Sequence, residues 1–231
     1  MKKTSPLRVA FQASLPVMTG YLVLGFGFGI LMQKQGYPWW LSGLMSLCVY
    51  AGSMQYAAVE LLTGGASLLT AALMTLMVNI RHLFYGVSML EPYQHTGKAR
   101  PYLIFSLTDE TFSLVCSPAL PESMPFASYA FWVSLLNQCY WVVGTLAGAW
   151  AGDVLPLNTT GIDFSMTALF VVIFVEQWEK TKEHRPALIG LGLSLLCLLL
   201  FGPSSFLIPS MVGIALALLV LRGKLEGGAK L

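Results

Sequence analysis

Apolar residues fill most of the chain in long runs, which short segments rich in polar residues, glycine and proline separate. A bilayer core of about 30 Å is crossed by about 20 helical residues, so runs of this length predict helices at membrane depth. The runs cover residues 12–33, 39–62, 66–90, 103–117, 126–151, 164–178, 187–201 and 206–222. We therefore expect an all-α integral membrane protein with six to eight membrane segments.

The composition agrees with this pattern. Of the 231 residues, 56% are hydrophobic and only 10% are charged, whereas soluble domains have about 25% charged residues. No soluble domain or low-complexity linker interrupts the runs, so residues 1–231 are expected to form a single transporter domain. The net charge of +2 is too small to indicate nucleic-acid binding.

The lysines and arginines indicate the orientation of the chain, because cytoplasmic loops are enriched in them. Lys2, Lys3 and Arg8 place the N-terminus in the cytoplasm, and the cations at 180–185 and 222–230 favour the same side. Eight plain spans satisfy these clusters but leave the cations at 98 and 100 outside.

A second topology removes this conflict. If 39–62 enters and leaves on the outer side and 103–117 on the inner side, six crossings remain and every cationic cluster faces the cytoplasm. Re-entrant or broken helices that enter from opposite faces are typical of inverted-repeat transporters. Both topologies remain open from the sequence.

Polar residues within the membrane segments form three groups, of which the first lies at residues 50–56. Small residues here permit local unwinding, and Ser53 and Gln55 supply hydrogen-bonding groups, so the segment is a candidate for holding a zwitterion. The alternative is that these residues only join neighbouring helices. Glu60 follows near the end of its run.

The second group, at residues 79–85, contains Asn79, Arg81, His82 and Tyr85. On a continuous helix Arg81 and Tyr85 share a face, and Asn79 with His82 lies beside it. Arg81 could pair with a substrate carboxylate or a buried acid, and His82 could carry a proton near neutral pH. The alternative is that Arg81 extends to the cytoplasmic interface.

The third group is Asp109 and Glu110 within residues 108–112. Two adjacent carboxylates at membrane depth cannot both be ionised cheaply without a nearby cation, so we expect one to pair with Arg81 or to bind a proton. Proton coupling is then a candidate role. The alternative is that 103–117 is an exposed loop.

Other features indicate packing rather than chemistry. Gly25-x-x-x-Gly29 and Gly144-x-x-x-Gly148-x-x-x-Gly152 predict close helix contacts, and Asn137-Gln138 predicts interhelical hydrogen bonds. The cysteines lie inside apolar runs without metal-binding spacing. The sequence contains no motif of an enzyme, a nucleotide site or a cofactor site, so we expect neither catalysis nor a metal or cofactor.

The order of three motifs resembles the AzlC family. They are Ala51 to Tyr56, Asn79-Ile80-Arg81-His82-x-x-Tyr85 and Thr108-Asp109-Glu110-x-Phe112, and the stretch 153–170 is similar to that family as well. Met54 stands where a small residue is expected.

The resemblance implies export of valine, leucine, isoleucine and methionine across a bacterial inner membrane. It also implies a small membrane subunit of the AzlD (YgaH) type as a partner. It assigns no binding residues, which rest on the intramembrane polar groups alone. A channel or facilitator for another small solute is the alternative, and a non-transporting scaffold has little reason to hold charges in the bilayer.

Overall fold

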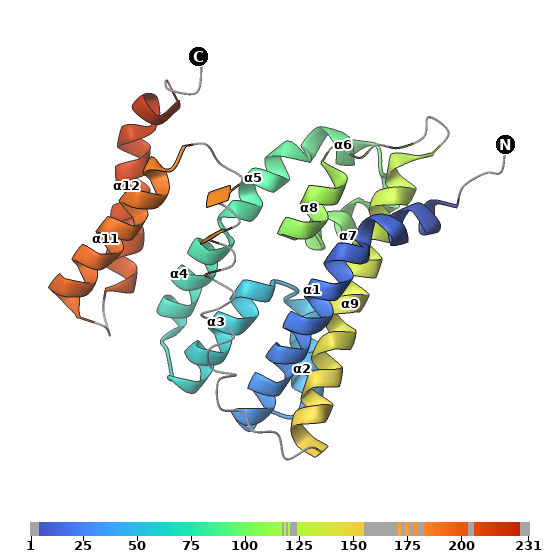
Figure 1. Ribbon diagram of the computed structural model, residues 1–231, viewed down its shortest axis with the longest axis horizontal. Helices are drawn as coiled ribbons and strands as arrows, with labels where there is room; N and C mark the ends of the chain where they lie inside the picture. Colours follow the sequence, from blue (N-terminus) through green and yellow to red (C-terminus); the bar gives the residue numbers. More distant parts are fainter. Residues whose placement is uncertain are drawn as a thin grey trace. The chain divides into compact units, whose positions relative to one another are not determined.

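The computed structural model describes residues 5–116, 118, 120, 124–154, 171, 174, 175, 178, 179, 183–202 and 206–226, and every regular element among them is helical (Figure 1). The expected all-α fold is confirmed for this part of the chain. The helices form two compact units, one of Met1–Ala71 with Val78–Met166 and one of Ala72–Met77 with Thr167–Leu231. Lys2, Lys3, the cations at 180–182, Lys230 and most of the run 164–178 lie outside the described residues.

Two helices of 29 residues, α1 (Pro6–Lys34) and α9 (Phe126–Val154), run in the same direction and form the centre of the first unit (Figure 1). At 1.5 Å per residue each is about 43 Å long. Ser14 and Tyr140 hydroxyls are 3.2 Å apart near one end, and Gln33 donates to Asp153 at 2.9 Å at the other. The two helices are therefore parallel neighbours along most of their length.

Glycines allow these two backbones to touch. A Cβ on Gly25 would lie 2.8 Å from the carbonyl oxygen of Trp141, and one on Gly144 would lie 2.8 Å from that of Leu22. Gly29 and Gly148 meet the opposite backbone as closely. A spacing of four puts each pair on one helix face, so the predicted packing faces are confirmed.

The run 39–62 is a broken hairpin made of α2 (Trp39–Cys48) and α3 (Gly52–Thr63). Helix α2 approaches the middle of α9, where Ser46 donates to Thr145 at 2.9 Å. Helix α3 returns toward the end of α1, since Tyr56 donates to the Leu24 carbonyl at 2.6 Å. At the break Tyr50 has φ 42°, a left-handed conformation that is strained for a residue with a side chain.

The run 103–117 is a second broken hairpin, made of α7 (Arg100–Phe105) and α8 (Asp109–Val115). Tyr102 donates to Gln138 at 2.8 Å, and after the break Tyr129 donates to the Leu114 carbonyl at 3.2 Å. The hairpin thus runs along α9 as far as Gln138 and then returns toward the start of α9. Thr108 caps α8 by accepting from the Thr111 amide at 3.3 Å.

The two hairpins enter from opposite ends of the first unit, and their breaks meet near its middle, where the rings of Tyr50 and Phe105 are 6.3 Å apart (Figure 1). Helices of 6 and 7 residues, α7 and α8, are each too short to cross a bilayer. The expectation of two broken segments is confirmed, and the exposed-loop alternative for 103–117 is wrong.

The run 66–90 is bent rather than continuous. Helix α4 (Leu68–Asn79), capped by Ser67, and helix α5 (Arg81–Ser88) meet at 46°. The short helices α6 (Leu90–Gln94) and η1 (Gly97–Ala99) follow. Among the described residues, α1 has the length and mean hydropathy of a complete span, and α4 with α5 does so as one broken span.

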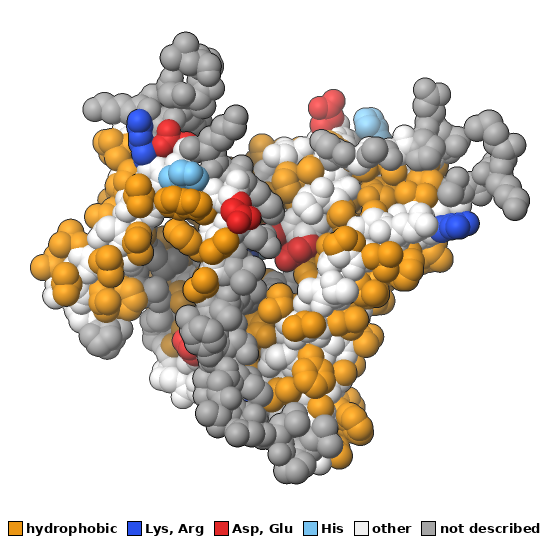
Figure 2. Space-filling model, viewed as in Figure 1, with side chains coloured by type: hydrophobic (Ala, Val, Ile, Leu, Met, Phe, Trp, Pro, Cys, Tyr) orange, Lys and Arg blue, Asp and Glu red, His pale blue; other side chains and the backbone are white. Residues whose placement is uncertain are grey.

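In the second unit, α11 (Arg185–Phe201) packs against α12 (Leu207–Glu226). Large apolar side chains remain exposed on both helices, including Leu199 at 84% and Val220 at 83%. Figure 2 shows hydrophobic side chains spread over much of the visible surface, with charged groups in a few places. Such a surface suits lipid or a membrane partner and not water.

We predict that cysteines at residues 94 and 125 are labelled from one face of the membrane and cysteines at residues 35 and 66 from the other. The hairpins place the first two at one end of the first unit and the last two at the opposite end. The measurement is labelling by an impermeant maleimide in a background without Cys48, Cys116, Cys139 and Cys197. Labelling of 35 and 66 from different faces would show that 39–63 crosses completely.

A second prediction concerns the α1–α9 contact. Gly148→Ala should destabilise the protein by about 1–3 kcal/mol, because the added methyl group forces two backbones apart. Gly20→Ala on α1 is the control, since a Cβ there meets nothing within 4 Å. Thermal unfolding in detergent measures both, and equal stability of the two variants would contradict the close contact.

Candidate functional site

A charge cluster lies where the two hairpins and α5 converge. Arg81 forms an ion pair with Asp109, with Nη1 and Oδ2 2.7 Å apart and each side chain 28% exposed. The other terminal nitrogen, Nη2, donates to Ser53 Oγ at 2.9 Å. The predicted pairing of Arg81 with a carboxylate is confirmed, and Arg81 does not extend to the interface.

Each residue of this cluster lies just after an interruption of a helix. Ser53 is in the first turn of α3, Arg81 is the first residue of α5, and Asp109 is the first residue of α8. A helix N-terminus stabilises a carboxylate and destabilises a cation. The positive charge of Arg81 at this position is therefore stabilised by Asp109, while the negative charge of Asp109 is stabilised both by the N-terminus of its own helix and by Arg81.

His82 extends the cluster. Its Nδ1 is 3.1 Å from the Asn79 carbonyl oxygen, and its Nε2 is 4.0 Å from Asp109 Oδ1. Within the described residues, Asp109 Oδ1 and Arg81 Nε are buried and have no hydrogen-bond partner. Oδ1 can therefore still accept a hydrogen bond, and Nε–H can still donate one to a ligand atom.

Tyr85 supports this arrangement from the side. Its ring stacks on Phe112 with centroids 4.5 Å apart and planes at 14°, and its edge meets His82 at 5.8 Å. These contacts join α5 to α8. Because the bend at residue 80 ends α4 before Arg81, Asn79 belongs to a different helix and approaches His82 through its backbone.

Glu110 is held separately from Arg81. The Tyr21 hydroxyl donates to Glu110 Oε2 at 2.6 Å and lies 2.7 Å from the Thr108 hydroxyl. Thr108 donates in turn to Thr111 at 3.0 Å, and Thr111 accepts from Asn137 at 3.1 Å. This network ties α8 to α1 and α9, so the two adjacent carboxylates have different partners.

Gln55 lies in a third polar cluster. It is fully buried, donates to Ser46 at 3.1 Å and accepts from the Trp141 indole at 2.9 Å. These bonds join α2, α3 and α9, as expected for interhelical contacts. Tyr21, Ser46 and Trp141 were not predicted as site residues, although polar and aromatic residues inside apolar runs are the signal that would have identified them.

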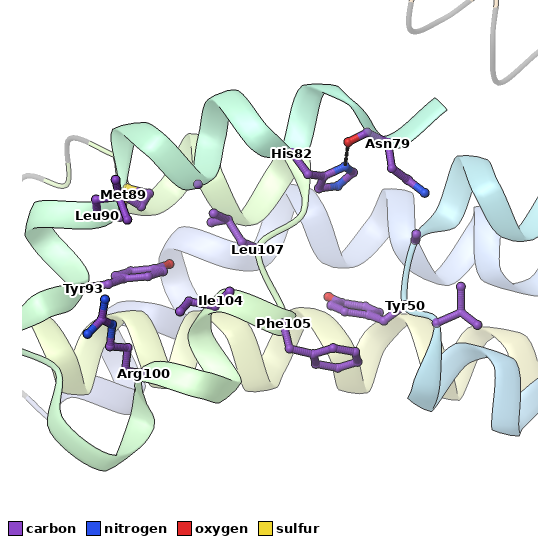
Figure 3. A pocket seen from close by; sticks show the side chains of 13 residues that line it. Tyr50, Asn79, His82, Met89, Leu90, Tyr93, Arg100, Ile104, Phe105 and Leu107 are labelled. Atoms are coloured by element: carbon purple, nitrogen blue, oxygen red, sulfur yellow. Dashed lines mark hydrogen bonds between the residues drawn. The ribbon is translucent and has the colours of Figure 1, made fainter. Parts of the chain in front are cut away.

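A cavity of about 280 Å³ lies beside the charge cluster in the first unit (Figure 3). Asn79 and His82 are the two predicted site residues that line it, and Tyr50 lines it from the α2–α3 break. The other lining residues, most of them apolar, are Val49, Ala51, Gly86, Met89, Leu90, Tyr93, Arg100, Ile104, Phe105 and Leu107. Its volume is close to the lower limit of about 300 Å³ for ligand pockets, which suits a small solute.

Helices broken at membrane depth, with paired charges at the breaks, define a membrane protein of the transporter class. The family model described as AzlC protein matches residues 16–155. The chain belongs to the AzlC family.

The relatives agree with this assignment. The chain is 46% identical to the branched-chain amino acid transport protein AzlC of Bacillus subtilis, over 95% of this chain and 86% of that protein. It is 44% identical to an uncharacterized membrane protein of Haemophilus influenzae, over 96% of this chain and 92% of that protein. Inner membrane protein YgaZ of Escherichia coli is 27% identical to the chain, over 74% of this chain and 72% of that protein. No solved structure matches the chain.

We predict that Arg81→Ala and Asp109→Asn each destabilise the folded protein by about 1–3 kcal/mol, less than the loss of a fully buried ion pair, because each side chain is 28% exposed. The Arg81→Ala/Asp109→Asn double variant should recover most of that loss, because neither charge is left alone. Thermal unfolding in detergent measures all three. Arg185→Ala is the control, since its exposed pair with Glu183 should contribute less than about 1 kcal/mol. Additive losses in the double variant would contradict pairing.

Proposed function

We propose that this protein is the large subunit of a secondary exporter of valine, leucine, isoleucine and methionine in a bacterial inner membrane. The observation that carries the proposal is the Arg81–Asp109 ion pair, at 2.7 Å, between two broken helices. The similarity to a branched-chain amino acid transport protein supports the substrate class.

The arrangement favours transport over a scaffold role. Charged groups at membrane depth are costly and usually mark a pathway for a substrate or an ion. Irregular backbone is tolerated there only where protein or a cavity surrounds it. Here the breaks at 49–51 and 106–108 carry lining residues of one cavity, including Tyr50, Ala51 and Leu107.

Coupling to protons is the driving mechanism that fits this site. The sequence contains no nucleotide-binding motif, so transport against a gradient requires an ion or a partner to drive it. Within the described residues, Asp109 Oδ1 has no hydrogen-bond partner and lies 4.0 Å from His82 Nε2. In this proposal, proton exchange between these groups controls the strength of the Arg81–Asp109 pair.

The proposed orientation places the N-terminus in the cytoplasm. The end of the first unit that carries the start of α1 also carries Leu90 and Arg100, which are exposed and line the cavity. This end then faces the cytoplasm, from which an exporter takes up its substrate.

A small AzlD/YgaH-type membrane subunit is the proposed partner. Helices α11 and α12 expose leucine and valine side chains over most of their length, and their packing against each other leaves these uncovered. A lateral helical partner could cover part of this surface by van der Waals packing.

We predict that proteoliposomes containing the chain with an AzlD-type subunit exchange labelled leucine for internal leucine, and that the chain alone does so at least about tenfold more slowly. A pH gradient should accelerate net efflux if protons drive it. Counterflow and efflux of labelled leucine are the measurements, with empty liposomes as the control. Full efflux by the isolated chain would overturn the partner proposal. Efflux indifferent to a pH gradient would favour a facilitator.

A further inference from the structure

Arg81, the residue that the sequence suggests for a substrate carboxylate, has its terminal nitrogens occupied. Nη1 contacts Asp109 and Nη2 donates to Ser53. A substrate carboxylate would have to displace one of these partners. The cavity contains a different cation, Arg100, for which no ion pair is found within the described residues.

Two tyrosine hydroxyls in the cavity lack partners. Tyr50 and Tyr93 are 4% and 2% exposed, and within the described residues neither hydroxyl has a partner at hydrogen-bond distance and angle, although that of Tyr50 lies near Tyr21 and Thr111. Figure 3 shows them at opposite ends of the cavity with their hydroxyls directed toward one another. A buried hydroxyl without a partner is costly, so an unpaired pair facing one cavity indicates a ligand that completes their hydrogen bonds.

The cavity wall is largely apolar. Ile104 and Leu107 lie between the tyrosines, and Met89 and Leu90 lie beside Tyr93 (Figure 3). Gly86 of α5 also lines the cavity. A Cβ built on Gly86 meets nothing within 4 Å, so the glycine leaves space that no protein atom fills. An apolar side chain of a few carbons fits such a wall, while polar groups at its ends can meet Arg100 and the hydroxyls.

We propose that this cavity is the amino-acid site and that Arg100 binds the substrate carboxylate. Tyr50 and Tyr93 form hydrogen bonds with the polar groups of the substrate. Gly86 sets the size of the substrate side chain that the cavity accepts. This inference rests on the proposed function. The Arg81–Asp109 pair then acts beside the substrate and does not bind its carboxylate.

Gly86 gives the sharpest test, because it lines the cavity and a Cβ added there meets nothing within 4 Å, so a larger side chain starts in open space. Gly86→Leu should fold normally and lower leucine counterflow more than about tenfold. Gly86→Ala should shift the preference from leucine toward valine and alanine, as one methylene changes discrimination by about 10- to 200-fold at most. The control is Gly20→Leu on α1, where a Cβ also meets nothing within 4 Å.

The tyrosines separate binding from stability. Tyr93→Phe and Tyr50→Phe should raise KM for leucine about 3- to 10-fold, which corresponds to one lost hydrogen bond, with an unchanged Tm. Tyr129→Phe is the matched control: its hydroxyl donates to the Leu114 carbonyl, so the variant should lose Tm and keep its KM. Arg100→Gln should raise KM for leucine more than Arg100→Lys, because lysine keeps the charge.

The outcomes distinguish the two proposals. If the unmodified complex exchanges neither leucine, nor methionine, nor any other branched-chain amino acid, the proposed function is wrong, and so is the proposed amino-acid site. If the complex exchanges leucine while Gly86→Leu and both tyrosine variants keep normal KM and rate, the function stands and this cavity is not the substrate site.

Discussion

Backbone groups and charges left without a partner at membrane depth are costly, and this constraint explains how the centre of the first unit is built. Each break in a helix frees backbone groups, and each charge there needs compensation. The chain meets these needs with its own side chains: Gln138 donates to the Leu47 carbonyl at the end of α2 at 3.2 Å, and Asp109 balances Arg81. Without such bonds the hairpins could not stop halfway across a bilayer.

Polar groups of the first unit differ in how fully the described residues satisfy them, and outside the cavity lining Ser42, Ser134 and Asn137 also keep one unbonded atom each. Gln55 has protein partners on both amide atoms, and Glu110 receives the Tyr21 hydroxyl. Around the cavity, by contrast, Asp109, Tyr50 and Tyr93 each keep an atom without a partner. A fully bonded cluster fixes the fold, whereas spare bonding capacity beside a cavity is available to a solute or a proton.

Much of this arrangement could be predicted from the sequence. Run length and composition predict a helical membrane protein, and the shortness of 103–117 with carboxylates at its centre predicts a break. The exact position of the break was not predicted, although Thr108 followed by two acids is a helix-start signal that marks it. The bend after Asn79 has no such signal, because residues 66–90 contain no proline near it and nothing local distinguishes a bent helix from a straight one.

Which residues share a cluster could not be predicted either. Asp109 and Glu110 are adjacent and chemically alike, yet they lie on different faces of α8, and only packing against α1 and α5 decides which meets Arg81. Gln55 and Ser53 are separated by one residue, and the helix turns one toward α9 and the other toward Arg81. Sequence spacing gives the faces, and tertiary contacts assign their neighbours.

The glycine contact between α1 and α9 has a mechanical consequence. Two backbones that touch over several turns cannot slide or rotate past each other, so this pair forms a rigid frame. Helices α2 and α7 are each attached to it by a hydrogen bond to α9. Helix α5 has no buried residue and contacts α8 through Arg81 and Tyr85. The ion pair and the ring contact are therefore the interactions described here that hold α5 against α8, and weakening the ion pair would loosen this contact.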